Sequence, residues 1–185
     1  MNFQENDPYH VCPTFESERF RLRQVEISDA DDLLECYKNP TASVRGNADN
    51  CTYGYGSQTL EEMQAFIRGW LGEYKNRSFV RWSVVDKLRD AAVGTIEMFG
   101  GACGILRVDL LGGYEQVEPI NEILDLILPG FFILFDCPII VTKAVPAAEE
   151  RIAALKRHGF ALSEKPLVGS GGIQYNDYWI LKRQG

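Results

Sequence analysis

Three consecutive apolar runs joined by very short connections constrain the fold of this chain more than any other feature. The runs are Phe79 to Val85, Val93 to Phe99 and Ile105 to Leu111, and the connections are DKLRD and GGACG. One connection is polar and the other is rich in glycine, and both have a length that suits antiparallel hairpins. The sequence therefore predicts an antiparallel meander in the middle of the chain.

A strand and two helices are expected before the meander. Residues 20–25 alternate as a strand does, and Ser28 with Asp31 predicts a capping box for a helix that ends at Asn39-Pro40. Residues 41–58 are rich in Gly, Asn and Ser and are predicted to form a loop. Thr59 with Glu62 predicts a second capping box, followed by apolar residues at helical spacing.

Helices and strands alternate after the meander. Residues 121–135 are apolar nearly all round and predict a covered helix that Pro129-Gly130 kinks or splits. A strand over 139–145 follows, and then a helix with Pro146 in its first turn and Gly159 as its cap. Strands near 160–163 and 175–181 close the chain. The order predicts one α/β (α+β) domain over 1–185, with 1–14 as an N-terminal extension.

Composition excludes several classes of function. The formal net charge of -7 without a basic run argues against nucleic acid and against an anionic membrane surface as partners. Five scattered cysteines without a CxxC pair indicate reduced thiols rather than disulfides or a metal site. Residues 1–15 lack the pattern of a signal peptide, and charges and prolines interrupt the apolar stretch 123–141. We therefore expect a cytoplasmic protein that does not enter a membrane.

The order of elements resembles that of the GNAT superfamily of N-acetyltransferases, and three local phrases strengthen the resemblance. The opening of the RimJ/RimL-like branch is similar to ESERFRLRQVEISDADDLLECYKNP. The second and third strands of that branch are similar to VRWSVVDKLRDAAVGTIEMFG, and its late helix is similar to ERIAALKRHGF. The resemblance spans Phe15 to Leu181. It implies a mixed, mostly antiparallel seven-stranded sheet flanked by about four helices, and acetyl-CoA as the donor for a small-molecule or peptide amine. A homodimer is compatible with it.

The resemblance also implies where the donor lies. The fourth and fifth strands of the family separate, and the pantetheine arm pairs with the backbone of the fourth strand, here Val108, Leu110 and Leu111. The next loop and helix N-terminus hold the pyrophosphate through N–H groups. For the phosphate end of the donor, the resemblance implies binding by Gln116, Val117, Ile120, Asn121 and, on the late helix, Arg151.

The phosphate loop departs from the family pattern, which has Gln or Arg, then Gly at the fourth position and Gly or Ala at the sixth. If Gln116 begins the motif, Pro119 and Asn121 stand at the fourth and sixth positions. If Glu115 begins the motif, Glu118 and Ile120 stand at these positions, so neither alignment keeps a glycine. Proline removes a hydrogen bond to phosphate, about 1.5–3 kcal/mol, and a carboxylate roughly 6 Å from a phosphate costs about 3 kcal/mol at a dielectric near 20. The helix dipole returns at most about 2 kcal/mol.

These magnitudes predict an affinity for acetyl-CoA that is lower by roughly two orders of magnitude or more, or lost. The late helix carries Ala148 and Arg151 where family members often place Asn and Ser, although Arg151 remains able to meet a phosphate. We therefore keep two hypotheses: an N-acetyltransferase with altered phosphate contacts, and a catalytically silent GNAT-fold module that binds a ligand in the old cleft.

Four side chains are candidates for catalysis. Glu97, between Ile96 and Met98, is either a general base or a solvated residue on the outer face of its strand. Asp109 either orients the amine or is a surface carboxylate at a strand end. Tyr53 and Tyr55 lie in the loop that borders the acceptor site in the family, and they either protonate the leaving thiolate or pack as aromatics. His158 is interpreted as a helix-capping residue.

Overall fold

The predicted meander forms the centre of an eight-stranded sheet in the computed structural model, which describes residues 7–39, 49 and 56–183. Its three strands are β3 (Val80–Asp86), β4 (Ala91–Phe99) and β5 (Gly104–Leu110), and both neighbouring pairs are antiparallel. The hairpin prediction is confirmed, with each strand boundary within two residues of its predicted position.

Five further strands extend the sheet in the order β1-β2-β3-β4-β5-β6-β10-β7. Only β5 and β6 pair in parallel within it. Their bounds are β1 Phe15–Glu16, β2 Phe20–Gln24, β6 Ile139–Lys143, β7 Ala161–Leu162 and β10 Tyr178–Lys182. The short strands β8 (Leu167–Val168) and β9 (Gln174–Tyr175) form a separate ladder. The described sheet thus has one strand more than the predicted seven and is mostly antiparallel, as predicted.

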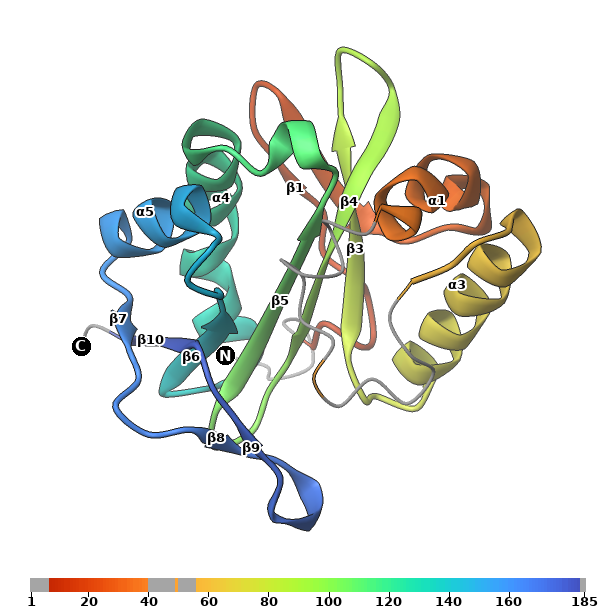
Figure 1. Cartoon of the computed structure of the whole chain (residues 1–185). Coiled ribbons are helices and arrows are strands. Elements are labelled where there is room, and N and C mark those ends of the chain that lie inside the picture. Colours follow the sequence, from red (N-terminus) through yellow and green to blue (C-terminus); the bar gives the residue numbers. More distant parts are fainter. Residues whose placement is uncertain (1–6, 40–48, 50–55, 184–185) are drawn as a thin grey trace.

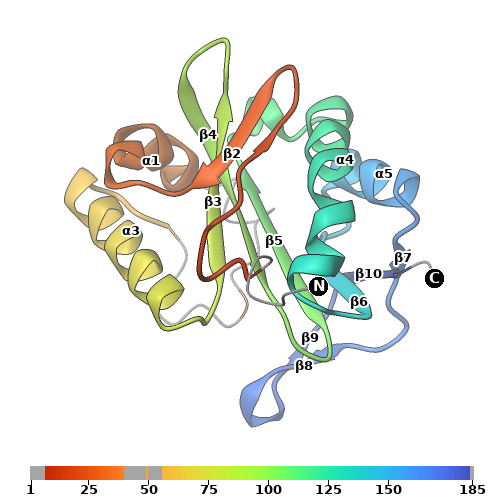
Figure 2. The same ribbon diagram turned by 180° about the vertical axis from the view of Figure 1, so that it is seen from behind.

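Helices cover both faces of this sheet. α1 (Ala30–Lys38) and α3 (Leu60–Lys75) lie on one face, while α4 (Val117–Leu134) and α5 (Glu149–Arg157) lie on the other (Figures 1 and 2). The described residues contain these four α-helices and three short 3-10 turns, η1 (Ile27–Asp29), η2 (Gly112–Tyr114) and η3 (Ser170–Gly172). In the described part of the chain, none of the helices combines the length and the apolarity needed to cross a bilayer.

The local signals for helix ends succeed in some places and fail in others. The Thr59 and Glu62 capping box is confirmed, and Gly159 ends α5 with a positive φ of 82°. The box predicted from Ser28 and Asp31 is wrong, because Glu26 and Asp29 form the box two residues earlier and nucleate η1. α5 begins at Glu149, so that the prediction of Pro146 in its first turn is also wrong.

α4 differs most from its prediction. It begins at Val117 rather than near 121, and it runs through Pro129 as one helix. A proline inside a helix costs about 3 kcal/mol, but α4 buries an apolar face against the sheet, including the fully buried Phe131. The burial of that face offsets the missing hydrogen bond. The early start places Pro119 in the first turn, where an absent N–H breaks no helical hydrogen bond.

The two faces of the meander differ in chemistry. One set of alternating side chains is apolar and joins the core shared with α4 and α5: Trp82, Val84, Ile96, Met98, Leu106, Val108 and Leu110. The other set is polar and lies toward α1 and α3: Arg81, Ser83, Thr95, Glu97, Arg107 and Asp109. All six polar residues are buried, which makes this face the natural place to look for a functional site.

Candidate functional site

The sheet opens between β5 and β6. Their parallel ladder comprises three pairs and ends at Leu106 and Thr142, while β5 stays paired with β4 as far as Leu110. From Arg107 to Leu110, the ladder contacts of β5 are therefore with β4 only. A backbone edge of this kind can pair with an extended ligand as an added strand would. This is the gap between strands that the family resemblance implies.

A bulge in β4 helps to shape the opening. Val84 pairs with Gly94 and Val85 with Ala92, so that one extra residue lies in β4 at this point. At Gly94, an added Cβ would overlap the carbonyl oxygen of Asp109 and lie 2.9 Å from Leu110 Cα. The close approach of β4 and β5 beside the gap therefore requires glycine here.

Glu97 lies in a row of charged residues across the polar face. In the register of the sheet, Glu97 is opposite Arg81 on β3 and Arg107 on β5. Both guanidinium groups contact it, with Arg81 Nε 3.2 Å from one carboxylate oxygen and Arg107 Nε 3.2 Å from the other. Only 3% of Glu97 is exposed. The interpretation of Glu97 as a solvated residue is therefore wrong, and its carboxylate is held between two cations.

Asp109 belongs to a second buried row, and its interpretation as a surface carboxylate is also wrong. The hydroxyl of Tyr37, on α1, donates to Asp109 Oδ2 at 3.0 Å. Arg81 Nη1 donates to the phenol oxygen at 2.8 Å, and Thr95 Oγ1 lies 2.7 Å from it. Burial raises the pKa of Tyr37 well above its usual value, and the charge of Asp109 adds to this. Tyr37 is therefore a neutral donor aimed at the carboxylate.

Asp49 bridges the two strands at the point where they part. Lys143 Nζ, on β6, lies 2.8 Å from both of its carboxylate oxygens, and Tyr178 OH donates to one of them at 3.2 Å. On the β5 side, Arg107 Nη2 donates to the Asp49 carbonyl at 2.5 Å. Asp49 thus lies at the open end of the sheet. Tyr53 and Tyr55 lie outside the described residues, and their roles stay predictions.

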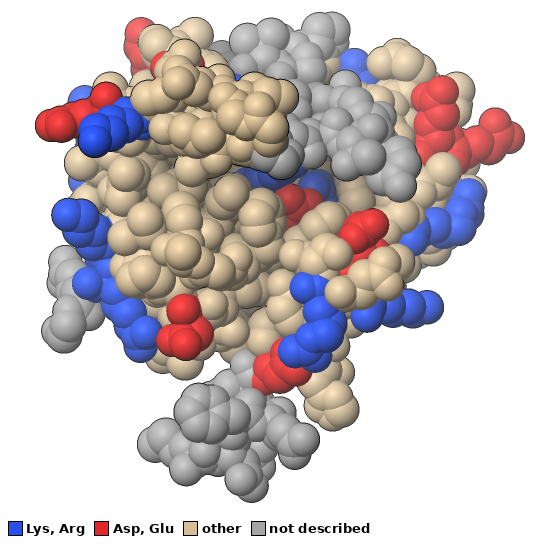
Figure 3. Space-filling view, turned by 90° about the horizontal axis from the view of Figure 1, so that it is seen from below, with Lys and Arg blue, Asp and Glu red and all other residues tan. Residues whose placement is uncertain are grey.

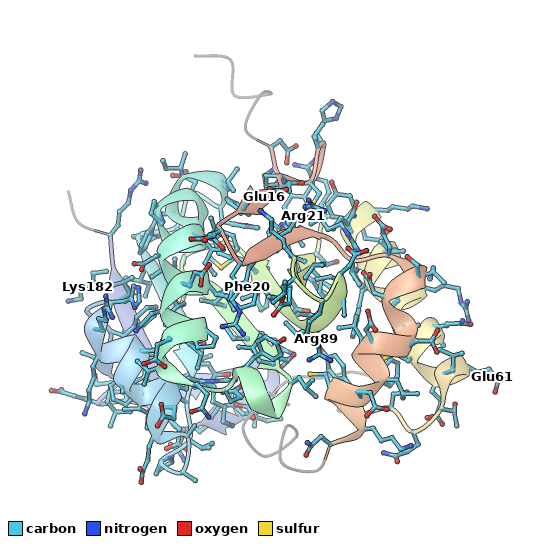
Figure 4. All side chains as sticks on the ribbon, turned by 90° about the horizontal axis from the view of Figure 1, so that it is seen from above. Glu16, Phe20, Arg21, Glu61, Arg89 and Lys182 are labelled. Carbon is cyan, nitrogen blue, oxygen red and sulfur yellow. The ribbon has the colours of Figure 1, made fainter. Side chains whose placement is uncertain are left out.

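The turn after β5 directs Glu115 inward. Tyr114, in η2, is buried, and its hydroxyl donates to Asp86 Oδ2 at 2.8 Å. Arg89 and Phe20 lie beside this turn (Figure 4), with Arg89 Nη1 3.5 Å from the Tyr114 hydroxyl. The next residue, Glu115, is 4% exposed and forms an ion pair with Arg151 of α5.

The other implied donor-binding residues take different positions. The side chains of Val108, Leu110 and Ile120 all lie in the core, so that only the backbones of the two β5 residues remain for a ligand. The N–H of Ile120 donates to Gln116 O at 3.2 Å within α4. Leu111 lies just beyond the strand and Gln116 is the exposed N-cap of α4. The N–H of Val117 donates to Glu150 of α5 at 3.1 Å. Asn121 is buried, and its amide atoms have no hydrogen-bond partner within the described parts of the chain.

Sequence reasoning did not single out several residues that the site contains. These are Tyr37, Arg81, Arg107, Lys143 and Glu150. The sequence does contain a pattern that points to Arg81 and Arg107, because charged or hydroxyl residues recur at alternate positions of all three meander strands. A buried polar face is one explanation of that alternation, and a solvated face is the other. Nothing local in the sequence distinguishes these two.

The surface seen from below carries charges of both signs (Figure 3). Seen from below, Lys and Arg side chains are interspersed with Asp and Glu among the residues drawn in colour (Figure 3). Within the ranges that the structure describes, no group of three or more His, Cys, Asp or Glu side chains is arranged to hold a metal ion.

No protein-family profile matches the chain. A curated protein of Bacillus subtilis (strain 168), named as the uncharacterized N-acetyltransferase YoaA, is 24% identical over 110 residues. That match covers 58% of this chain and 56% of YoaA, so the chain spans about half the length of this relative.

Solved structures match over nearly the whole chain. A GNAT-family acetyltransferase from Bacillus anthracis has a TM-score of 0.69 at 15% identity, covering 92% of this chain and 98% of its own. A ribosomal-protein-alanine acetyltransferase from Vibrio fischeri has a TM-score of 0.68 at 18% identity, covering 91% and 94%. RimL, solved in complex with coenzyme A, has a TM-score of 0.70 at 14% identity, covering 92% and 98%. The chain therefore has the fold of the GNAT acetyltransferases.

Proposed function

We propose that this chain transfers an acetyl group from acetyl-CoA to a primary amine, at a protein N-terminus or on a small molecule. The observation that carries the proposal is the open edge of β5 from Arg107 to Leu110, beside a buried carboxylate. The N-acetyltransferase name of YoaA and the coenzyme A bound to RimL support it. A fold alone does not define an activity, so the proposal depends on the residues along that edge.

The residues fit one part of the donor and not the other. The edge of β5 beyond its ladder with β6 suits the amide groups of a pantetheine arm, which can pair with a strand backbone. At the phosphate end, Glu115 is buried against Arg151 and Glu150 accepts the first N–H of α4. These groups are already paired within the chain and do not fit a diphosphate. We therefore derive the chemistry from the chain's own residues at the acyl end.

Asp109 is the better candidate for removing the proton that an attacking amine must lose. It lies on the stretch of β5 that faces the gap, and Tyr37 donates to one of its oxygens. Glu97 is less suited to the task, because two arginines contact its carboxylate, whereas a single arginine of the described residues pairs with Asp109, with Arg81 Nη1 3.6 Å from its Oδ2. We assign to Glu97 the role of holding Arg81, which in turn holds the Tyr37 hydroxyl.

A thiol-release assay tests the function and the assignment together. Purified protein is mixed with millimolar acetyl-CoA and a panel of primary amines and short peptides, and free thiol is measured. The Asp109→Asn variant is expected to lower kcat/KM about 10²–10⁴-fold, the usual contribution of a general base. The control is Asp90→Asn, which changes an exposed residue in the β3–β4 hairpin. Donor-dependent thiol release that never exceeds the protein-free rate contradicts the function, and equal rates in both variants contradict the role of Asp109.

A second function follows from the carboxylates at the phosphate end. The buried Glu115 and Arg151 pair favours a silent module that binds a neutral or cationic ligand in the same cleft. Such a protein would show no thermal shift with any acetyl thioester, whereas the enzyme would. This measurement separates the two functions without an assay of turnover.

A further inference from the structure

We propose that Glu115 and Glu150 are specificity residues that occupy the phosphate-binding groups, so that the acyl donor is selected by its pantetheine arm and not by its nucleotide end. The inference rests on the proposed function and defines the donor that the site accepts. It predicts that the 3′-phospho-ADP part of acetyl-CoA adds little affinity.

Several N–H groups near the start of α4 have an acceptor within the chain or are missing. Val117 N–H donates to the carboxylate of Glu150 at 3.1 Å, and Pro119 has none. In the turn before the helix, Tyr114 N–H donates to Leu111 O at 2.7 Å and Glu115 N–H to Gly112 O at 3.3 Å. A helix N-terminus binds phosphate through N–H groups that have no other acceptor. Of the first three residues of α4, only Glu118 retains its N–H for this purpose, and its own side chain is anionic.

Arg151, the cation at this end of the cleft, is already paired with Glu115. Arg151 and Glu115 are 3% and 4% exposed, and Arg151 Nε lies 3.2 Å from Glu115 Oε2. The second guanidinium nitrogen contacts the other carboxylate oxygen, so the pair is bidentate. If Arg151 turned to a phosphate, Glu115 would remain buried without its counter-charge. The exchange is therefore unfavourable, although Arg151 has the chemistry of a phosphate ligand.

The fold holds Glu115 in this position. Tyr114, the preceding residue, is fixed by its hydrogen bond to Asp86 and by ring contact with Phe20, with centroids 6.1 Å apart. Figure 4 shows Phe20 and Arg89 next to the η2 turn that carries Tyr114. These contacts fix the backbone turn from which Glu115 extends, and the ion pair with Arg151 fixes its side chain.

The space between the two helix N-termini is acidic. A cavity of about 170 Å³ lies there, and its lining includes Glu115, Gln116, Ala148, Glu149, Glu150 and Arg151. Three carboxylates face one guanidinium, and that guanidinium is neutralised by Glu115. A diphosphate would enter a region of negative potential. A pantetheine arm carries no charge, so these carboxylates do not repel it as they repel a diphosphate.

Calorimetric titrations with two donors test the inference. Acetyl-CoA and S-acetylpantetheine, which lacks the nucleotide end, are titrated into the wild-type chain and into Glu150→Gln and Glu115→Gln/Glu150→Gln variants at 0.15 M salt. In the wild type the two dissociation constants are expected to agree within about threefold. In the double variant the affinity for acetyl-CoA is expected to rise at least about tenfold, with that for S-acetylpantetheine unchanged.

Two variants guard against trivial explanations. Glu150 is exposed, so Glu150→Gln is expected to leave folding intact and to raise the affinity for acetyl-CoA alone by roughly threefold or more, even if the double variant is unstable. Glu149→Gln removes the same charge from the neighbouring exposed residue, whereas Glu150→Gln also weakens the acceptor of the Val117 N–H. A change below about twofold is expected for Glu149→Gln, because salt screens the general field.

The outcomes separate this inference from the proposed function. Wild-type acetyl-CoA binding that is tenfold or more tighter than that of S-acetylpantetheine overturns the inference and leaves the acetyltransferase proposal standing. The inference is also overturned if neither Glu150→Gln nor the double variant binds acetyl-CoA more tightly than the wild type. If neither donor binds any variant at millimolar concentration, the proposed function itself fails.

Discussion

The carboxylate of Glu97 is the clearest case in which a single residue supports the site. It is buried between Arg81 and Arg107, and its charge raises the pKa of Arg81 even though burial acts in the opposite direction. Glu97→Gln leaves two buried cations short of a counter-charge, and we expect it to lower the free energy of unfolding by about 3–5 kcal/mol. Urea denaturation followed by circular dichroism measures the loss.

An exposed ion pair provides the matched control. Arg21 and Glu16 lie side by side at the edge of the sheet (Figure 4), with side chains 43% and 46% exposed. Arg21→Gln is expected to change the free energy of unfolding by at most about 1 kcal/mol. Similar losses in both variants would show that Glu97 contributes no more than a surface pair.

Sequence patterns locate such residues but do not establish their environment. The alternation around Glu97 and Asp109 places both side chains on the same face of the meander, and this is what the structure has. Their burial depends on α1 and α3 covering that face, and their partners depend on the register between strands. Both are long-range properties that a local pattern does not encode. The carboxylates could therefore be named as candidates, whereas Tyr37 and the two arginines could not.

At the scale of elements, the contact of β4 with β5 beside the gap depends on Gly94. We expect Gly94→Ala to destabilise the chain by about 1–3 kcal/mol, because the new Cβ would overlap Asp109 O and push the strands apart. The same displacement would move Asp109, so thiol release should fall as well. Gly113→Ala, where an added Cβ meets nothing within 4 Å, is expected to stay within about 0.5 kcal/mol of the wild type in thermal or urea unfolding. A Gly94 variant as stable as the Gly113 variant would contradict the proposed role of the close approach.

The elements differ in how much of them the sequence predicts. The meander was predictable because its hairpin connections are too short for any other pairing. The start of α4 was not, since Glu118 and Pro119 look like loop residues until the first turn of a helix is recognised as a place that tolerates both. The inward direction of Glu115 was also missed. The sequence indicated an acidic phosphate loop but not that Arg151 would neutralise it.

At the scale of the whole molecule, the order of elements was sufficient to predict the GNAT fold, and the chemistry of the cleft was not. The fold brings the N-termini of α4 and α5 together and opens β5 beside them, irrespective of which side chains occupy that space. The side chains present are carboxylates paired within the chain. The chemistry of the cleft is therefore a property of a few residues placed on the framework of the fold.

Acid stability is a further property of the whole molecule that can be traced to particular carboxylates. Asp29 joins η1 to two strands, because Arg23 of β2 donates to it at 2.6 and 2.9 Å and Ser83 of β3 at 2.6 Å. Burial acts to raise the pKa of Asp29, but these hydrogen bonds and the charge of Arg23 outweigh it and lower the pKa below its usual value. A carboxyl group with a lowered pKa stabilises the folded state above its unfolded pKa, about 3.9, and this stability is lost as the pH falls through the lower, folded value.

We therefore expect the free energy of unfolding to drop between about pH 5 and pH 2, with Asp29 responsible for part of the drop. Asp29→Asn should be less stable than the wild type at pH 7, and the difference should shrink as the pH falls, because the amide cannot gain the proton that the carboxylate gains. Asp31→Asn, an exposed change on α1, is the control and should parallel the wild type. Urea unfolding at five or six pH values tests this, and a gap between Asp29→Asn and the wild type that stays constant down to the acid end would mean that Asp29 does not titrate with unfolding.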